Sequence, residues 1–425
     1  MSISYSETIT QIGSMHFLIR DTQNLAHAFP DAHGSKIYGL IAVSGGSMKW
    51  KGWLLAAMAS LMMLGLTLQP VAALNSAREG LALFLTVVLP SLLPFMVCAQ
   101  LFIESGAASA AGKALNRLMR PLFACPGESA FALTAGLLAG YPTGARLALD
   151  LYEQGLISKQ DAARTGLLAS SCGPVFMLGA VGAGLLQNPA AGWLILISHI
   201  TAVLLTGVLF SIGGNRTAGS VVQPPSAMGR PMMEAFGEAV KKTVFTLWTV
   251  GGYIVLFSVL SALLKRYNLL VPAASALAPV LKLLGLEQSL AAPLAIGAIE
   301  MTNGCNAVAA AQATLANRCA AMAVLVSFGG LCIQAQSMLF LSGAGLSFGR
   351  FLLMKTAQAA IAFAACRAFA LIPAFDAVLC MGSVAVPGFT FASALLSSAV
   401  YTAGGMLVFV GLSFISGRAS TRGSA

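Results

Sequence analysis

A break in an apolar run carries the first residues that could do chemistry. Gly-Tyr-Pro-Thr-Gly, residues 140–144, interrupts a stretch of Leu and Ala, and Arg146 follows at once. Proline stops main-chain hydrogen bonding and glycine permits a reversal, so the break predicts the tip of a helical hairpin. Exposed amides there can bind an anion with the help of an arginine. In the alternative, Arg146 extends to the membrane surface and the glycines only permit close packing. The candidate binding residues are Tyr141, Thr143, Gly144 and Arg146.

A second break contains a lone carboxylate. Glu300 is the one ionisable residue between Glu287 and Arg318, and it lies within "IEMTNGCNA". A carboxylate at membrane depth is costly unless it is protonated, paired or hydrated, so it predicts proton or cation coupling, or contact with a substrate. A structural ion pair with Arg146 is the alternative. The candidate residues at this break are Glu300, Thr302, Asn303 and Asn306.

Further polar side chains lie inside apolar segments. Ser170, Ser171 and Cys172 precede a Gly-Pro pair, where freed carbonyls need partners, and we expect them to line a cavity; local capping of the helix end is the alternative. Gln334 and Gln336 are candidates for ligand binding or for helix–helix hydrogen bonds. We expect His199 to be a helix-contact histidine and Arg367 to extend to the membrane surface. The candidate binding residues in these segments are Ser171, Cys172, Ser327, Gln334 and Gln336.

The elements that position these residues are membrane helices. The chain has 425 residues, of which 57% are hydrophobic and only 9% are charged. Apolar runs long enough to cross ~30 Å of hydrocarbon recur along it. We therefore predict an all-α polytopic membrane protein. The expected spans are residues 53–74, 80–103, 165–187, 191–213, 243–264, 319–341, 351–373 and 390–414.

Two stretches of the chain follow the same order. Each has a span, a connector, a broken segment (129–150 or 293–311), a span with a break and a further span. Ser171-Cys172-Gly173-Pro174 corresponds to Ser327-Phe328-Gly329-Gly330. If both broken segments are re-entrant hairpins, most loop Lys and Arg residues, Lys355 included, lie on the inner side. The halves are then inverted, which is typical of secondary transporters with a site between interrupted helices.

The repeat predicts a division of the chain into segments. Residues 1–47 are polar and without clear periodicity, and the segment that begins at Met48 resembles the translation start of a bacterial membrane protein. We therefore expect 1–47 to be a disordered tail or an extension added by a mispredicted translation start. A regulatory segment is the alternative. The run that follows could also be a signal peptide cleaved after Val71-Ala72-Ala73. The expected segments are a first transmembrane helix (48–78), a first repeat (79–213), a cytoplasmic linker (214–242), a second, inverted repeat (243–373) and a C-terminal transmembrane helix with a tail (374–425).

Composition also argues against other classes of protein. The net charge of +10 is spread over short loops, as membrane topology requires, so we expect no nucleic-acid partner. The His and Cys residues show no metal-binding spacing, and nucleotide-binding or nucleophile motifs are missing from the sequence. We expect neither an enzyme nor a cofactor, apart from a coupling cation such as H⁺ or Na⁺.

Three motifs resemble one family. "AREGLALFLTVVLPSLLPFMV" (77–97), "GLLAGYPTGARLALDLYEQGLISKQDAAR" (136–164) and "CGPVFMLGAVGAGLL" (172–186) are similar to the sporulation integral membrane proteins of the YlbJ (SpoVV) type. That family resembles the wider nucleoside recognition, or Gate, superfamily, which includes concentrative nucleoside transporters and the membrane domain of the ferrous-iron transporter. The resemblance implies transport of dipicolinic acid across the mother-cell-derived membrane around the forespore.

The implied substrate agrees with most of the predicted site. Dipicolinate is a planar dianion that cannot cross hydrocarbon without groups that replace its hydration. Glu300 departs from this picture, because it would repel a dianion unless it is protonated or binds a cation. We expect a small-molecule anion and the lipid bilayer as partners, and a homo-oligomer is a further expectation. The alternatives are a nucleoside-type carrier and a non-transporting membrane scaffold for spore assembly.

Overall fold

The computed structural model describes residues 50–212 and 231–372. The extension 1–47, the span 390–414 and most of the linker 214–242 lie outside these residues. All regular elements of the described chain are helical, which confirms the all-α prediction. The chain divides into two units, residues 1–64 and 65–425. The described part of the first unit is most of helix α3 (Trp50–Leu68).

The first half of the second unit begins with a nearly continuous helix and continues with shorter ones. Its elements are α4 (Pro70–Leu83), the π-helical turn η1 (Phe84–Val88), α5 (Leu89–Glu104), α6 (Ala107–Phe123), α7 (Ser129–Ala139), α8 (Thr143–Glu153), α9 (Lys159–Ala169), the π-helix η2 (Val175–Leu185) and α10 (Pro189–Ser211). The expected basic connector is largely α6, which is bent by 79° from α5.

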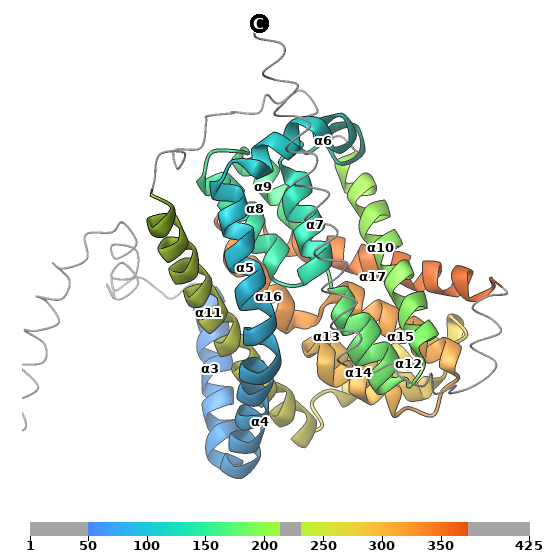
Figure 1. Cartoon of the computed structure of the whole chain (residues 1–425). Coiled ribbons are helices and arrows are strands. Elements are labelled where there is room, and N and C mark those ends of the chain that lie inside the picture. Colours follow the sequence, from blue (N-terminus) through green and yellow to red (C-terminus); the bar gives the residue numbers. More distant parts are fainter. Residues whose placement is uncertain (1–49, 213–230, 373–425) are drawn as a thin grey trace, which may run out of the picture. The chain divides into compact units, whose positions relative to one another are not determined.

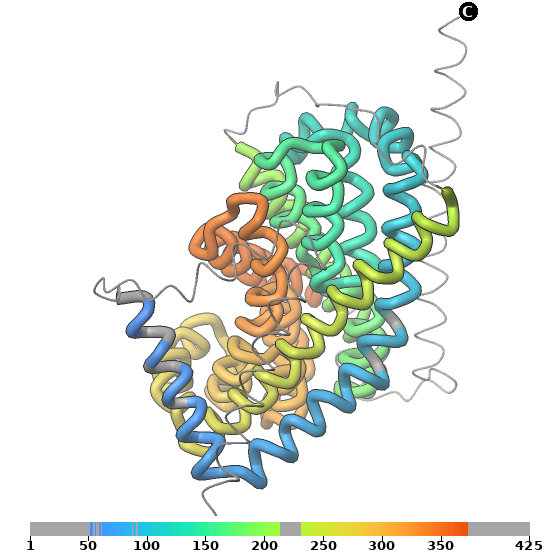
Figure 2. Tube along the Cα trace, turned by 90° about the vertical axis from the view of Figure 1, so that its left-hand side faces the viewer, coloured from blue at the N-terminus to red at the C-terminus, as the bar shows by residue number. Residues whose placement is uncertain are grey.

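The second half repeats this order. Its elements are α11 (Met232–Arg266), α12 (Val271–Leu283), the 3-10 turn η3 (Gln288–Leu290), α13 (Ala291–Ile299), α14 (Met301–Ala309), α15 (Leu315–Phe328), α16 (Gly330–Leu341) and α17 (Phe348–Ala370). Within this unit, α6 to α9 gather at one end and α12 to α15 at the other, while α10 and α11 extend along both groups (Figures 1 and 2).

Both predicted broken segments are helical hairpins. Their arms are only about 14–17 Å long at 1.5 Å per residue, too short to cross ~30 Å of hydrocarbon alone. The arms of the second hairpin touch through glycine, because a Cβ on Gly304 would lie 2.2 Å from Cα of Gly297. In the first hairpin a Cβ on Gly136 would lie 3.1 Å from Cα of Gly144. The sequence predicted the tip of each hairpin at the observed break.

Each hairpin also packs against the break in the span that follows it. A Cβ on Gly140, whose φ is +85°, would lie 2.7 Å from the amide nitrogen of Gly173. In the second half a Cβ on Gly330 (φ +66°) would lie 2.9 Å from the carbonyl oxygen of Gly297. Only glycine permits both the close approach and the positive φ. The four breaks therefore pack as two pairs.

Several expected spans are interrupted. Four helices of the described chain are long and apolar enough to cross a membrane, or up to five if a bent pair forms one span. Three of the four correspond to the expected spans 191–213, 243–264 and 351–373, and the fourth, Leu315–Leu341, is broken at Gly329. The expected span 165–187 is divided because the chain leaves the helix at Ser170 and Pro174 cannot donate a main-chain hydrogen bond. The expected span 53–74 is divided at Gln69, before Pro70.

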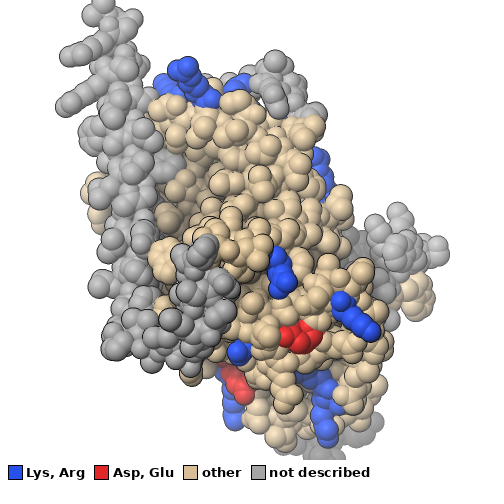
Figure 3. Space-filling view, turned by 90° about the vertical axis from the view of Figure 1, so that its right-hand side faces the viewer, with Lys and Arg blue, Asp and Glu red and all other residues tan. Residues whose placement is uncertain are grey.

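The surface of the described chain agrees with a lipid environment. On one face the upper half of the view is almost free of charged residues below the Lys and Arg at its top, whereas Lys, Arg, Asp and Glu lie from the centre of the view downward (Figure 3). Large apolar side chains of α10, such as Leu205 and Leu209, are about half exposed. Apolar side chains remain in such positions where hydrocarbon, and not water, surrounds a helix.

Candidate functional site

The broken spans of the two halves meet at His199 of α10. The main-chain N–H of Cys172 donates to His199 Nε2 at 3.1 Å, so Nε2 is an acceptor. The proton therefore lies on Nδ1, which donates to Ser327 Oγ at 2.8 Å. Ser171 Oγ lies 3.0 Å from Nε2 and donates to the same nitrogen. His199 thus bonds Ser171 and Ser327, the two serines at matching places in the repeat.

A lysine lies completely buried beside these breaks. Lys355 of α17 has no exposed surface. Its ammonium donates to Tyr141 Oη at 2.7 Å, to the carbonyl oxygen of Ser170 at 3.0 Å and to Gln358 Oε1 at 2.8 Å. Tyr141 Oη in turn donates to the carbonyl oxygen of Val326 at 3.3 Å. These bonds tie the tip of the first hairpin to the second half of the chain.

We call this set of side chains the junction. The three hydrogen-bond acceptors of the Lys355 ammonium are neutral, and none of the described Asp or Glu residues forms an ion pair with it. A buried cation without a counter-ion is costly and makes the site attractive to an anion. The residues of the junction are Tyr141, Ser170, Ser171, Cys172, His199, Ser327, Lys355 and Gln358.

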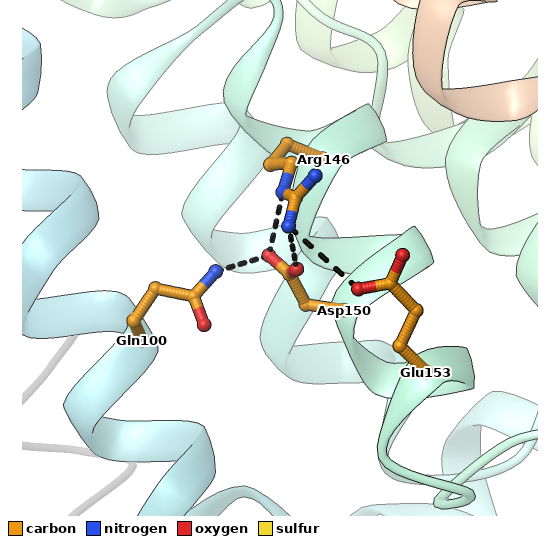
Figure 4. A network of polar contacts seen from close by, with 4 residues as sticks. All are labelled: Gln100, Arg146, Asp150 and Glu153. Atoms are coloured by element: carbon orange, nitrogen blue, oxygen red, sulfur yellow. Dashed lines mark hydrogen bonds and ion pairs between the residues drawn. The ribbon is translucent and has the colours of Figure 1, made fainter. Parts of the chain in front are cut away.

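Arg146, the cation predicted at the first break, has its own counter-ion. Its guanidinium lies 2.6 Å from Asp150 Oδ1, one turn along α8, and 3.7 Å from Glu153. Gln100 of α5 donates to the same Asp150 carboxylate (Figure 4). The guanidinium also lies 5.6 Å from the ring centroid of Phe340. Its charge is largely compensated within the first half of the chain.

Glu300 caps a helix. Its carboxylate accepts the main-chain N–H groups of Thr302 at 3.0 Å and Asn303 at 2.7 Å, at the start of α14. The alternative ion pair between Glu300 and Arg146 is not formed, because each has these other partners. Asn306 lies exposed on the same helix, α14. The second tip therefore uses its acidic group to hold its own backbone.

Four further predicted residues are buried but lie outside the junction's hydrogen bonds, namely Thr143, Gly144, Gln334 and Gln336. Gln334 Nε2 donates to the carbonyl of Phe328 at 3.2 Å, and Gln336 Nε2 donates to Cys332 Sγ at 3.3 Å. Gly144 packs on α9, where a Cβ would lie 2.1 Å from the carbonyl oxygen of Ala169. Several buried polar atoms have no hydrogen-bond partner among the described residues. Among them are Thr143 Oγ1, Gln334 Oε1, Ser337 Oγ and Gln358 Nε2.

Sequence reasoning missed the charge at the centre of the junction. Lys355 was expected among the inner loop residues, and its complete burial shows that this assignment was wrong. The signal was present, because Lys355 lies inside the expected span 351–373 with Gln358 less than one turn later. Asp150 was missed for a similar reason: it follows Arg146 by four residues, the spacing of a helical ion pair.

Comparisons with known proteins agree with the two-part architecture. A family described as "Nucleoside recognition" (Gate) matches residues 85–186 and 247–345, one stretch in each half. The sporulation integral membrane protein YlbJ of Bacillus subtilis (strain 168) is 31% identical over 307 residues, which cover 68% of this chain and 75% of that protein. No solved structure matches the chain.

Proposed function

Because the chain belongs to the family of YlbJ-type sporulation integral membrane proteins, we propose that it transports a small aromatic or heterocyclic anion across a membrane. We propose dipicolinic acid as the substrate, alternating access as the mechanism, and the mother-cell-derived membrane around the forespore as the location. The observation that carries the proposal is the buried, uncompensated ammonium of Lys355 where the breaks of both halves meet.

The groups beside Lys355 suit a carboxylate. An ammonium bound by three neutral acceptors can exchange one of them for a carboxylate oxygen, which is a stronger acceptor. Gln358 already accepts from Lys355 through Oε1, and its Nε2 has no partner among the described residues, so this amide offers a second donor. Tyr141 presents an aromatic ring to the same ammonium, 5.0 Å from the ring centroid. A planar dicarboxylate could meet each of these groups.

Access to Lys355 requires movement. The lysine and Gln358 are buried, so an anion reaches them only after α17 separates from the first hairpin or from the break after α9. Both contacts of Lys355 across this boundary are single hydrogen bonds, to Tyr141 Oη and to the Ser170 carbonyl. Exchange of such bonds for bonds to a substrate gives the differential affinity that alternating access needs.

Proteoliposomes with the purified chain test the proposal. We expect uptake of labelled dipicolinate by the wild type and a loss of about ten- to a hundred-fold in Lys355→Met, since a charged hydrogen bond is worth about 1.5–3 kcal/mol. The melting temperature of Lys355→Met should be retained or raised, because the variant removes a buried charge. Lys241→Met, at an exposed lysine of α11, is the matched control.

The outcomes separate the candidate functions. Absence of dipicolinate uptake by folded wild-type protein, or full uptake by Lys355→Met, overturns the proposal. The Gate description favours a nucleoside-type carrier as the second candidate. Uptake of labelled uridine without dipicolinate would support that alternative.

A further inference from the structure

A basic pocket opens between two helices that lead to the junction. It has a volume of about 400 Å³ and is lined by the first turns of α9 and α17 and the loop before α17. Three cations line it, and none of its lining residues is acidic. None of these cations forms an ion pair with a described carboxylate. The polar residues that line the pocket are Lys159, Gln160, Arg164, Ser347 and Arg350.

Helix ends add to the positive potential of the pocket. Both α9 and α17 begin at its wall, and the start of a helix carries a partial positive charge. Asp161 in the first turn of α9 does not line the pocket, because its buried carboxylate accepts from Ser158 Oγ at 2.7 Å. The charges and helix ends that line the pocket therefore favour the binding of an anion.

The pocket lies on the same helices as Lys355. On α17, Lys355 follows Arg350 by five residues, or about 7.5 Å along the axis. On α9, Arg164 lines the pocket, and Ser170, whose carbonyl accepts from Lys355, ends the same helix. The basic pocket and the buried ammonium are therefore separated by between one and two helical turns.

An apolar layer fills that interval. Buried side chains from five segments pack together there, and Leu167 and Leu346 of this layer also line the pocket. Such a layer blocks an anion until the helices move, because a charge cannot enter an apolar contact without paying for its lost hydration. The layer consists of Ala145, Leu167, Phe340, Leu341, Leu346, Phe351 and Met354.

We propose that the basic pocket is the vestibule where the anionic substrate binds before it passes the apolar layer to reach Lys355. The inference rests on the proposed transport function. A volume of about 400 Å³ is within the usual range for small-molecule sites and accommodates a single aromatic ring with two carboxylates.

The adjoining crevice argues against a lipid as the ligand. It shares Arg164, Leu167 and Arg350 with the pocket and is otherwise mostly apolar, but its volume is about 20 Å³. That is room for about one water molecule and not for an acyl chain. A small soluble anion therefore fits the pocket better than the headgroup of an anionic phospholipid.

The test is the double variant Lys159→Gln/Arg350→Gln, studied in membrane vesicles of both orientations. We expect the KM for dipicolinate to rise about tenfold, with the maximal rate retained, only in vesicles that present the pocket to the added substrate. The rise should shrink at high salt, which screens surface charges. Lys241→Gln is the matched control, since that side chain is exposed and far along the chain from the pocket.

Two results would overturn the vestibule: an unchanged KM in both orientations, or an equal rise of KM in both orientations. If KM is unchanged and anionic lipid no longer co-purifies with the double variant, the pocket is a headgroup site. Failure of the proposed function itself is a different result, because the wild type would then transport no dipicolinate in either orientation.

Discussion

The two hairpins share a design and differ in how they use their polar groups. A glutamate precedes each hairpin, Glu128 directly and Glu287 before the 3-10 turn η3, and each hairpin has two short arms joined by a break. In the first hairpin, the tip residue Tyr141 reaches Lys355 and the Val326 carbonyl in the other half. In the second, the tip residue Glu300 binds only main-chain groups of its own arm among its described hydrogen bonds.

This difference shows that the repeat determines the backbone arrangement of the two halves and not which polar side chains bind each other. Glycine contacts and breaks recur in both halves because they depend on backbone geometry, which both halves need. The cation of the junction comes from α17 alone. A pseudo-symmetric scaffold therefore holds an asymmetric site, and variants at matching places should have unequal effects on transport.

The largest expected effect concerns what the hairpins share. Gly304→Val should destabilise the protein by about 3 kcal/mol or prevent folding, because the new side chain would overlap the Gly297 backbone. Gly136→Val should act similarly, since its Cβ would lie 2.1 Å from the Ala169 carbonyl oxygen. Thermal unfolding in detergent measures both effects.

Gly252→Val is the control for these glycine variants. A Cβ there meets nothing within 4 Å, so we expect a melting temperature near that of the wild type. A stable Gly304→Val protein would show that the arms do not touch as described, and the shared design would then apply to one hairpin only.

A smaller effect distinguishes the charged residues of the two hairpins. Arg146→Gln leaves Asp150, 1% exposed, without its main partner and should cost about 2 kcal/mol, most of which Asp150→Asn should restore. Glu300→Ala loses a helix cap and should cost about 1 kcal/mol. The effects of Arg146→Gln and Glu300→Ala should add, because their partners differ.

Transport by the restored double variant then tests the predicted anion site. If Arg146→Gln/Asp150→Asn folds and still moves dipicolinate at the wild-type rate, Arg146 does not bind the substrate. A loss of transport in that stable protein would indicate that Arg146 binds the substrate. Non-additive losses in the Arg146 and Glu300 pair would instead mean that the two hairpins are coupled.

The smallest effect is a pH dependence of opposite sign at the two starting glutamates. Burial holds the pKa of Glu128 above its ordinary 4.5, against the charges of Arg120 and Lys113. The folded state then binds more protons, so stability falls as pH rises above about 4.5. Glu128→Gln should therefore raise the melting temperature at pH 7 and change it little in acid.

Glu287 has the reverse dependence. Burial raises its pKa, but hydrogen bonds from the Thr314 N–H and from Asn317 outweigh burial and hold the pKa below 4.5. Its stabilising contribution is present above pH 4.5 and is lost as pH falls through the folded-state pKa. Glu287→Gln should therefore lower the melting temperature at pH 7, and the difference from the wild type should narrow in acid. Shifts of the same sign at both glutamates would contradict the comparison.

The sequence predicted the positions of the helix breaks in this protein. Proline and glycine act on the backbone within one or two residues, so the breaks at 140–142 and at Gly173-Pro174 could be read directly from the chain. The break at Glu300 has neither residue within two positions and was predicted from its matching place in the repeat. The correspondence of Ser171 with Ser327 was also visible in the letters. That both serines would bind one histidine was not, because their partner His199 lies in a third helix.

The sequence by itself determined that the chain is helical, apolar, broken at defined places and built as a repeat, since each of these follows from local periodicity or from single-residue geometry. Only the tertiary structure decided which polar groups meet. Arg146 and Glu300 looked alike as lone charges, yet one pairs with Asp150 and the other caps a helix. Lys355 reaches Tyr141, 214 residues away, because packing of α17 against the hairpin and the α9 break brings them within 2.7 Å, and no local pattern encodes that approach.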